Sequence, residues 1–155
     1  MKNEDREILC SLIRDHEDTV GSSRVTMMAI KAFIESIKQV RCRVEEVREL
    51  YSELSEAIKN TEPKVIPLIH LIEEFEKEIG EAPDASIDQI KDQAIRILEE
   101  KHHKIITKTG KVIEHGLTCI SEGDVIIVHT ISYDVTNMLK LAKEVLQKTF
   151  KVIVL

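Results

Sequence analysis

The hydrophobic periodicity changes near the C-terminal end of the chain, and this change limits the folds that the chain can adopt. Before residue 120, apolar residues recur every three or four positions, which is typical of amphipathic helices. Val125–His129 and Phe150–Leu155 are instead short, continuous apolar runs rich in β-branched residues. Such runs are typical of buried parallel strands, and the segment between them has helical spacing again. The pattern predicts a mainly α chain in which a helical bundle (1–120) precedes one βαβ unit (121–155).

Five helices are expected in the first region. They cover residues 4–16, 25–37, 44–58, 64–79 and a long segment from residue 87 to about residue 117. Thr19–Ser23 predicts a break between the first two helices, because it combines glycine with residues that favour the N-cap position. Ser86 and Gln89 are spaced as a capping box. Gly110 and Gly116 weaken the later turns of the long helix, so we expect a kink or break near Thr109.

Two parallel strands and one crossover helix do not make a complete sheet. One face of such a sheet lacks cover, and both edges keep unpaired backbone groups. Either a partner chain completes the sheet, or the sequence is the front part of a longer protein. We expect the second, and treat the α/β region as incomplete.

Composition and charge exclude several classes of protein. With 43% hydrophobic residues and a formal net charge of −6, the chain is neither disordered nor suited to gripping a nucleic acid backbone. No apolar run spans a bilayer, and the acidic, amphipathic N-terminus does not resemble a secretory signal, so we expect a cytoplasmic protein without a membrane partner. Cys10, Cys42 and Cys119 form no C-x-x-C pair, so no metal site is expected; Cys10 and Cys119 are expected in the core.

The first candidate binding site lies at the predicted start of the second helix. Gly21, Ser22, Ser23 and Arg24 combine a glycine, free backbone N–H groups and a cation, which together can hold a phosphate or a carboxylate. The alternative is an ordinary serine N-cap followed by a solvated arginine. The residues alone leave both interpretations open.

The second candidate lies where the first predicted strand ends. His129, Thr130 and Ser132 follow this strand and lead into a helix N-terminus. In open α/β sheets, ligands bind beyond the carboxyl ends of the strands. The alternative is that Ser132 or Asp134 only caps the helix and that His129 is a hydrogen-bonded interior residue. His70, on an apolar helix face, is interpreted as a core histidine.

The same segment resembles a known protein family. Ile120–Ser132 is similar to the I-x-D-G-D-x-I-L-T-H-x-x-S segment of the translation initiation factor 2B alpha/beta/delta family, and Phe150–Val154 is similar to its F-x-V-x-V-T-E strand. Pro63–His70 resembles the P-S-x-x-P-L-x-N stretch of bacterial and archaeal members, and Gly21–Ser23 resembles the family's first glycine-containing loop. The resemblance extends over nearly the whole chain and implies a helical N-terminal domain followed by a Rossmann-like domain.

The resemblance also defines the functional alternatives. Family members include regulatory and catalytic subunits of a guanine nucleotide exchange complex. Others are isomerases that act on ribose 1,5-bisphosphate or methylthioribose 1-phosphate. In the isomerases a cysteine follows the histidine of the strand segment, and an aspartate lies further on. Here Thr130 stands in the cysteine position, and the aspartate position would lie beyond Leu155. His70 replaces the usual asparagine, and Val20 stands where isomerases have an arginine.

We therefore expect an initiation factor 2B-like protein without catalytic residues. Its role would be protein interaction, binding of a phosphorylated metabolite or nucleotide, or both, without a cofactor and without direct contact to nucleic acid. Partners would be family-like subunits in a homo- or hetero-oligomer. One alternative is an aldose–ketose sugar-phosphate isomerase, although a threonine hydroxyl is a far weaker acid and nucleophile than a thiol. The other alternative is a free-standing helical interaction module.

Overall fold

The computed structural model describes residues 3–39, 41, 44–61, 64–79, 86–129 and 132–155, and helices dominate this part of the chain. In chain order the elements are α1 (Asn3–Val20), α2 (Ser22–Gln39), α3 (Val44–Lys59), α4 (Ile66–Ile79), α5 (Ile87–Thr118), β1 (Val125–Val128), α6 (Tyr133–Glu144) and β2 (Lys151–Val154). Helices come first and a βαβ unit comes last, as the change of periodicity predicts. The mainly α fold class is confirmed.

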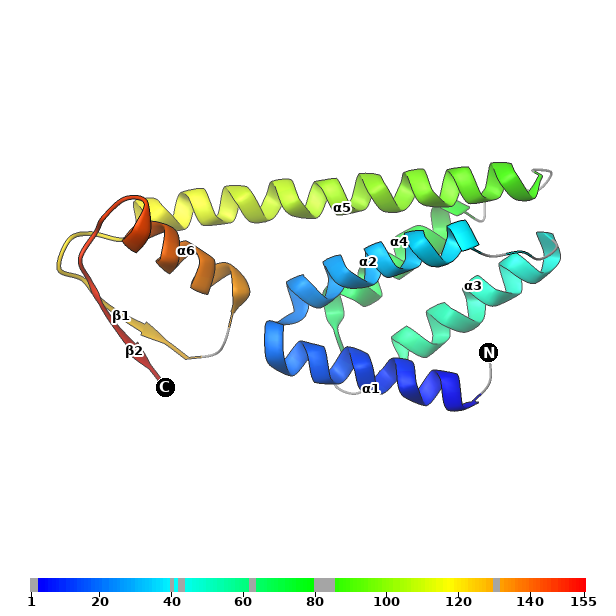
Figure 1. Cartoon of the computed structure of the whole chain (residues 1–155), viewed down its shortest axis with the longest axis horizontal. Helices are drawn as coiled ribbons and strands as arrows, with labels where there is room; N and C mark the ends of the chain where they lie inside the picture. The colour runs from blue at the N-terminus through cyan, green and yellow to red at the C-terminus, as the bar shows by residue number, and fades with distance from the viewer. Residues whose placement is uncertain (1–2, 40, 42–43, 62–63, 80–85, 130–131) are drawn as a thin grey trace.

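The long helix α5 runs along most of the length of the molecule and contacts both the helical bundle and the βαβ unit (Figure 1). Helices α2 and α4 pack against its N-terminal part, and α6 packs against its C-terminal part. The predicted capping box is present, because the Ser86 side chain accepts a hydrogen bond from the Gln89 N–H and the Gln89 side chain accepts one from the Ser86 N–H.

The kink or break predicted near Thr109 is wrong, because α5 is one continuous helix of 32 residues and has no sharp bend (Figure 1). Glycine lowers helix stability but keeps the backbone hydrogen bonds, so packing against the rest of the chain can override it. Gly116 also has a packing role. A Cβ at this position would overlap the sulfur of Met138 on α6, so the glycine allows α6 to approach α5 closely.

The main hydrophobic core lies among the bundle helices. α2 packs on α4 and α5, α3 packs on α4, and α1 closes the bundle against α2 and α3. Ile30, Leu68 and Ala94 contribute fully buried side chains from α2, α4 and α5. Tyr51 and Phe75 meet edge to face with ring centroids 5.6 Å apart, joining α3 to α4. Burial of a large aliphatic side chain such as Ile30 or Leu68 contributes about 1.5–3 kcal/mol to the stability of the fold.

Several side chains differ from the expectations. Cys119 is exposed at the C-terminus of α5, so its assignment to the core is wrong. Cys10 is only half-buried, and its Sγ donates a hydrogen bond to the carbonyl of Ala57. His70 is exposed on α4, because the core-facing positions of that helix are occupied by larger apolar residues. Cys42 lies outside the described residues.

The two strands form a parallel sheet in which Val125 pairs with Lys151 and Val128 with Val154. The Lys151 N–H donates to Asp124 O at 2.8 Å, and the Leu155 N–H donates to Val128 O at 2.9 Å. The parallel pairing is as predicted, but the strands are not buried on both faces. Val125 and Ile127 are 58% and 63% exposed, because none of the described elements covers their face of the sheet. Helix α6 lies on the other side, across a cavity of about 400 Å³ from Val128 and Val152.

Polar side chains fix where β1 begins. Asp124 accepts a hydrogen bond from the Ser121 N–H at 2.7 Å, and Glu122 accepts one from the Thr149 N–H at 3.0 Å. The Lys148 ammonium group donates to Leu117 O and Ile120 O, at the C-terminal end of α5. This lysine satisfies carbonyl groups that have no partner within the helix. The βαβ unit is therefore anchored to the end of α5.

Candidate functional site

The turn between α1 and α2 is a single residue, Gly21. Helix α1 continues to Val20 and α2 begins at Ser22, so the predicted break is shorter than expected. Gly21 has a φ of 81°, a left-handed conformation that glycine adopts readily. Its carbonyl accepts the first hydrogen bond of α2, from the Val25 N–H, so Gly21 and not a serine occupies the N-cap position.

The serines predicted to cap α2 lie inside its first turn instead. The Ser22 carbonyl accepts a hydrogen bond from the Thr26 hydroxyl at 2.8 Å. The backbone N–H groups of Ser23 and Arg24 belong to the first turn, where no acceptor exists within the helix. The N-terminus of α2 is also the positive end of the helix dipole, where negative charge is stabilised.

The second group of predicted residues surrounds the start of α6. Ser132 is the N-cap of α6, and its hydroxyl accepts a hydrogen bond from the Val135 N–H at 3.4 Å. This is the capping role that the sequence left as an alternative. His129 follows β1 and is exposed, so it is not an interior residue. Thr130 lies outside the described residues.

The structure brings these two groups together, which the sequence did not predict. The guanidinium carbon of Arg24 lies 4.6 Å from the centroid of the Tyr133 ring, the first residue of α6. Figure 1 shows the N-terminal end of α6 beside the turn between α1 and α2. A cation–π contact at such an exposed position contributes about 0.5–1 kcal/mol. Arg24 therefore has a specific partner and is not only a solvated arginine, as the alternative interpretation had it. The N-termini of α2 and α6 meet at this junction.

Asp134, the next residue of α6, adds an unsatisfied acceptor to the junction. Its Oδ1 atom is buried and has no hydrogen-bond partner among the described residues. Buried polar atoms in folded proteins are nearly always bonded to protein, water or ligand. A carboxylate oxygen accepts hydrogen bonds only, so a group that completes this site must donate one.

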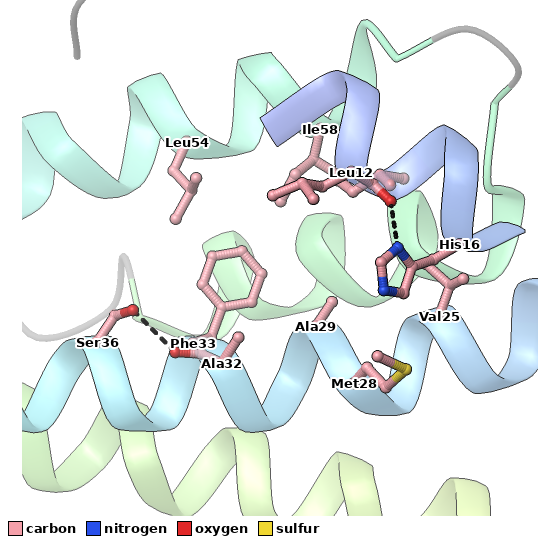
Figure 2. A pocket seen from close by; sticks show the side chains of 11 residues that line it. Leu12, His16, Val25, Met28, Ala29, Ala32, Phe33, Ser36, Leu54 and Ile58 are labelled. Carbon is pink, nitrogen blue, oxygen red and sulfur yellow. Dashed lines mark hydrogen bonds between the residues drawn. The ribbon is translucent and has the colours of Figure 1, made fainter. Parts of the chain in front are cut away.

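Sequence reasoning missed an apolar cavity in the bundle. Its volume is about 350 Å³, and it lies among α1, α2 and α3 (Figure 2). Phe33 points from α2 towards α3, and Leu12 and His16 approach from α1. The one available signal was the width of the apolar surface of α2, because Met28, Ala29 and Ala32 extend it beyond the core-facing positions.

Among the described residues, the histidines and acidic residues elsewhere on the helices form no cluster that could hold a metal ion. His102 is half-buried on α5, and burial lowers its pKa, with smaller contributions from Lys31 and His103. Lys101 forms ion pairs with Glu74 at 2.8 Å and Glu78 at 2.7 Å, which link α5 to α4. No group of three or more histidine, cysteine, aspartate or glutamate side chains in the described part of the chain could hold a metal ion.

Comparison with known proteins identifies the family. None of the helices described is long and apolar enough to cross a membrane. No curated protein matches the sequence. The model of the initiation factor 2 subunit family matches residues 18–155, which include both groups of residues at the junction between α2 and α6. The chain therefore belongs to the initiation factor 2 subunit family.

Proposed function

We propose that this chain binds a phosphorylated sugar or a nucleotide at the junction between α2 and α6, in a regulatory rather than a catalytic role. The contact between Arg24 and Tyr133 carries the proposal, because it places a cation where the N-termini of two helices meet. Helix N-termini and arginine side chains are the commonest components of phosphate sites in proteins.

The phosphate would be held on the α2 side of the junction. A guanidinium group stacked on an aromatic ring keeps its N–H donors in the plane of the group, where they can form paired hydrogen bonds to phosphate oxygens. The Ser23 and Arg24 N–H groups supply further donors. Gly21 has no side chain, so the ligand can approach the backbone closely.

The rest of the ligand would carry hydroxyl groups. Asp134 follows Tyr133 in the first turn of α6, and its carboxylate repels phosphate but accepts hydrogen bonds from hydroxyl groups. A ligand with phosphate at one end and hydroxyls at the other satisfies both conditions, as a sugar phosphate or the ribose of a nucleotide does. His129, which is exposed after β1, is proposed as a further contact to the same ligand.

Residue identity at one position supports a non-catalytic role. The isomerases that the sequence resembles have a cysteine where this chain has Thr130. A threonine hydroxyl does not ionise near neutral pH and does not replace a thiol as acid or nucleophile. Incubation with ribose 1,5-bisphosphate and methylthioribose 1-phosphate should give no turnover, and sustained turnover of either would reject this part of the proposal.

Calorimetry with defined probes tests the binding site. Ribose 5-phosphate and adenosine monophosphate should bind, whereas ribose and adenosine should bind far more weakly. Removal of one or two charge-assisted hydrogen bonds by Arg24→Ala should lower the affinity by about ten- to a hundredfold. Arg96→Ala is the matched control, because Arg96 is an exposed arginine on α5 that pairs with Glu100. Equal losses in both variants would reject the site.

We further propose that the exposed sheet binds a family-like subunit. Ile153 and Leu155 are 46% and 73% exposed, and they lie on the same face of the sheet as Val125 and Ile127. Contiguous apolar surface of this kind is typical of protein interfaces. Ile127→Lys should shift sedimentation of the purified chain to a smaller species. Ile106→Lys changes an exposed isoleucine of α5 and should leave sedimentation unchanged. A monomer at all concentrations would refute a homo-oligomer.

A further inference from the structure

The apolar cavity among α1, α2 and α3 is a second, independent feature of the bundle. Its lining is almost entirely carbon and comprises Leu12, Ile13, His16, Val25, Met28, Ala29, Ala32, Phe33, Ser36, Leu54 and Ile58. Figure 2 shows these side chains arranged around the space between α2 and α3, with α1 across one end. Leu12 and Met28 are 52% and 44% exposed and lie at its edge. The cavity is therefore open to solvent on one side.

The size of the cavity indicates the kind of occupant. Small-molecule pockets in proteins have volumes of about 300–1,000 Å³, and a helix with its side chains is about 10–12 Å across. A volume of about 350 Å³ fits a molecule of around ten heavy atoms better than it fits a segment of protein. The apolar lining favours a hydrocarbon body, whether aliphatic or aromatic.

His16 is an exposed residue of α1 that lines the cavity, and it supplies the polar group that contacts the other end of the occupant. Its Nδ1 lies 2.9 Å from the carbonyl oxygen of Leu12. A carbonyl only accepts hydrogen bonds, so Nδ1 carries the proton and, in the neutral ring, Nε2 presents a lone pair. Figure 2 shows that the second ring nitrogen faces Ala29 and Met28, on the side of the cavity. No hydrogen bond joins this nitrogen to another described residue.

We propose that this cavity binds a small apolar molecule with one hydroxyl group, such as a medium-chain alcohol or an alkylphenol. The hydrocarbon part lies against Phe33 and Leu54, and the hydroxyl donates a hydrogen bond to His16 Nε2. An ionised carboxylate has no proton to donate, so the corresponding fatty acid binds more weakly. The site is separate from the junction between α2 and α6 and does not depend on the function proposed for that junction.

The test is a titration of the full chain with 1-octanol, octanoate and octane, followed by NMR of the methyl groups of Met28, Ala29 and Leu54. 1-Octanol should give saturable shifts at these methyls. Ala29→Leu fills the cavity and should abolish the shifts at Met28 and Leu54. His16→Phe keeps the ring but removes the acceptor, and should weaken octanol binding by about tenfold, as expected for one hydrogen bond. His70→Phe is the matched control, because His70 is an exposed histidine away from the cavity.

Results of four kinds would overturn the proposal. The first is the absence of saturable octanol shifts in the wild-type chain. The second is unchanged binding in Ala29→Leu with circular dichroism showing an intact fold, which would place the alcohol elsewhere. The third is octanoate binding as strongly as octanol, or equal losses in His16→Phe and His70→Phe, because the hydroxyl assignment would then be wrong. The fourth is a homodimer that octanol disperses, which would make a second copy of the chain the occupant.

Discussion

The two glycines of α5 predict opposite responses to the same substitution. Replacement of glycine by alanine inside a helix stabilises it by about 0.5–1 kcal/mol, because alanine loses less backbone entropy. At Gly110 no atom outside the neighbouring residues and backbone of the same helix lies within 4 Å of the added Cβ, so this gain should be realised in full. Gly110→Ala should raise the melting temperature by about 2–4 °C per kcal/mol in a chain of this size.

At Gly116 the added methyl group would overlap the sulfur of Met138. Overpacking of a helix contact costs about 1–3 kcal/mol, which exceeds the gain in helix propensity. Gly116→Ala should therefore lower the free energy of unfolding by about 0–2 kcal/mol. The flexible methionine can move aside in part, which places the expected value in the lower half of that range.

Urea denaturation followed by circular dichroism measures both variants, and a double-mutant cycle isolates the contact. In a Met138→Ala background the overlap is absent, so Gly116→Ala should there stabilise the chain by about the amount seen at Gly110. A change of sign between the two backgrounds confirms that α6 packs directly on α5 at this point. Equal stabilisation by Gly110→Ala and Gly116→Ala in the wild-type background would refute the reasoning.

Two further predictions concern stability. Ser86→Ala removes the N-cap of α5 and should lower the free energy of unfolding by about 1 kcal/mol in urea denaturation, with no effect expected if the capping box does not form. A hydrogen bond from Lys101 is the main cause that lowers the pKa of the Glu74 carboxyl. The ion pair between these residues therefore stabilises the fold fully above the ordinary pKa of a carboxyl, and this stabilisation is lost as pH falls through the lowered pKa. Lys101→Met should therefore flatten the loss of stability between about pH 5 and pH 2, whereas Arg96→Met, in an exposed ion pair, should leave that slope unchanged.

Local patterns explain what was predictable in the fold. The apolar spacing of 44–58 gave a helix within one residue of α3, and the positions of Ser86 and Gln89 gave the start of α5. The β-branched runs gave both strands and their parallel pairing. These features depend on neighbours a few residues away, so the sequence contains the information directly.

The wrong predictions concern features that depend on contacts between residues far apart in the sequence. Glycine at residues 110 and 116 predicted a kink in α5, but the packing of α6 at residue 116 makes that glycine part of a straight helix. The strands were expected to be buried because of their composition. Burial depends on the elements that cover them, and α6 covers one face only among those described.

At the candidate site, too, local sequence signals predicted some features and tertiary packing decided the others. The sequence by itself determined that Gly21–Arg24 and Ser132 stand at helix starts, because capping residues and glycines are local signals. Only the tertiary structure decided that Arg24 meets Tyr133, that Asp134 has a buried oxygen without a partner among the described residues, and that α1, α2 and α3 line a cavity. These three features depend on how helices far apart in the sequence pack against each other, and the apolar pattern of one helix does not specify which side chains of another helix it meets.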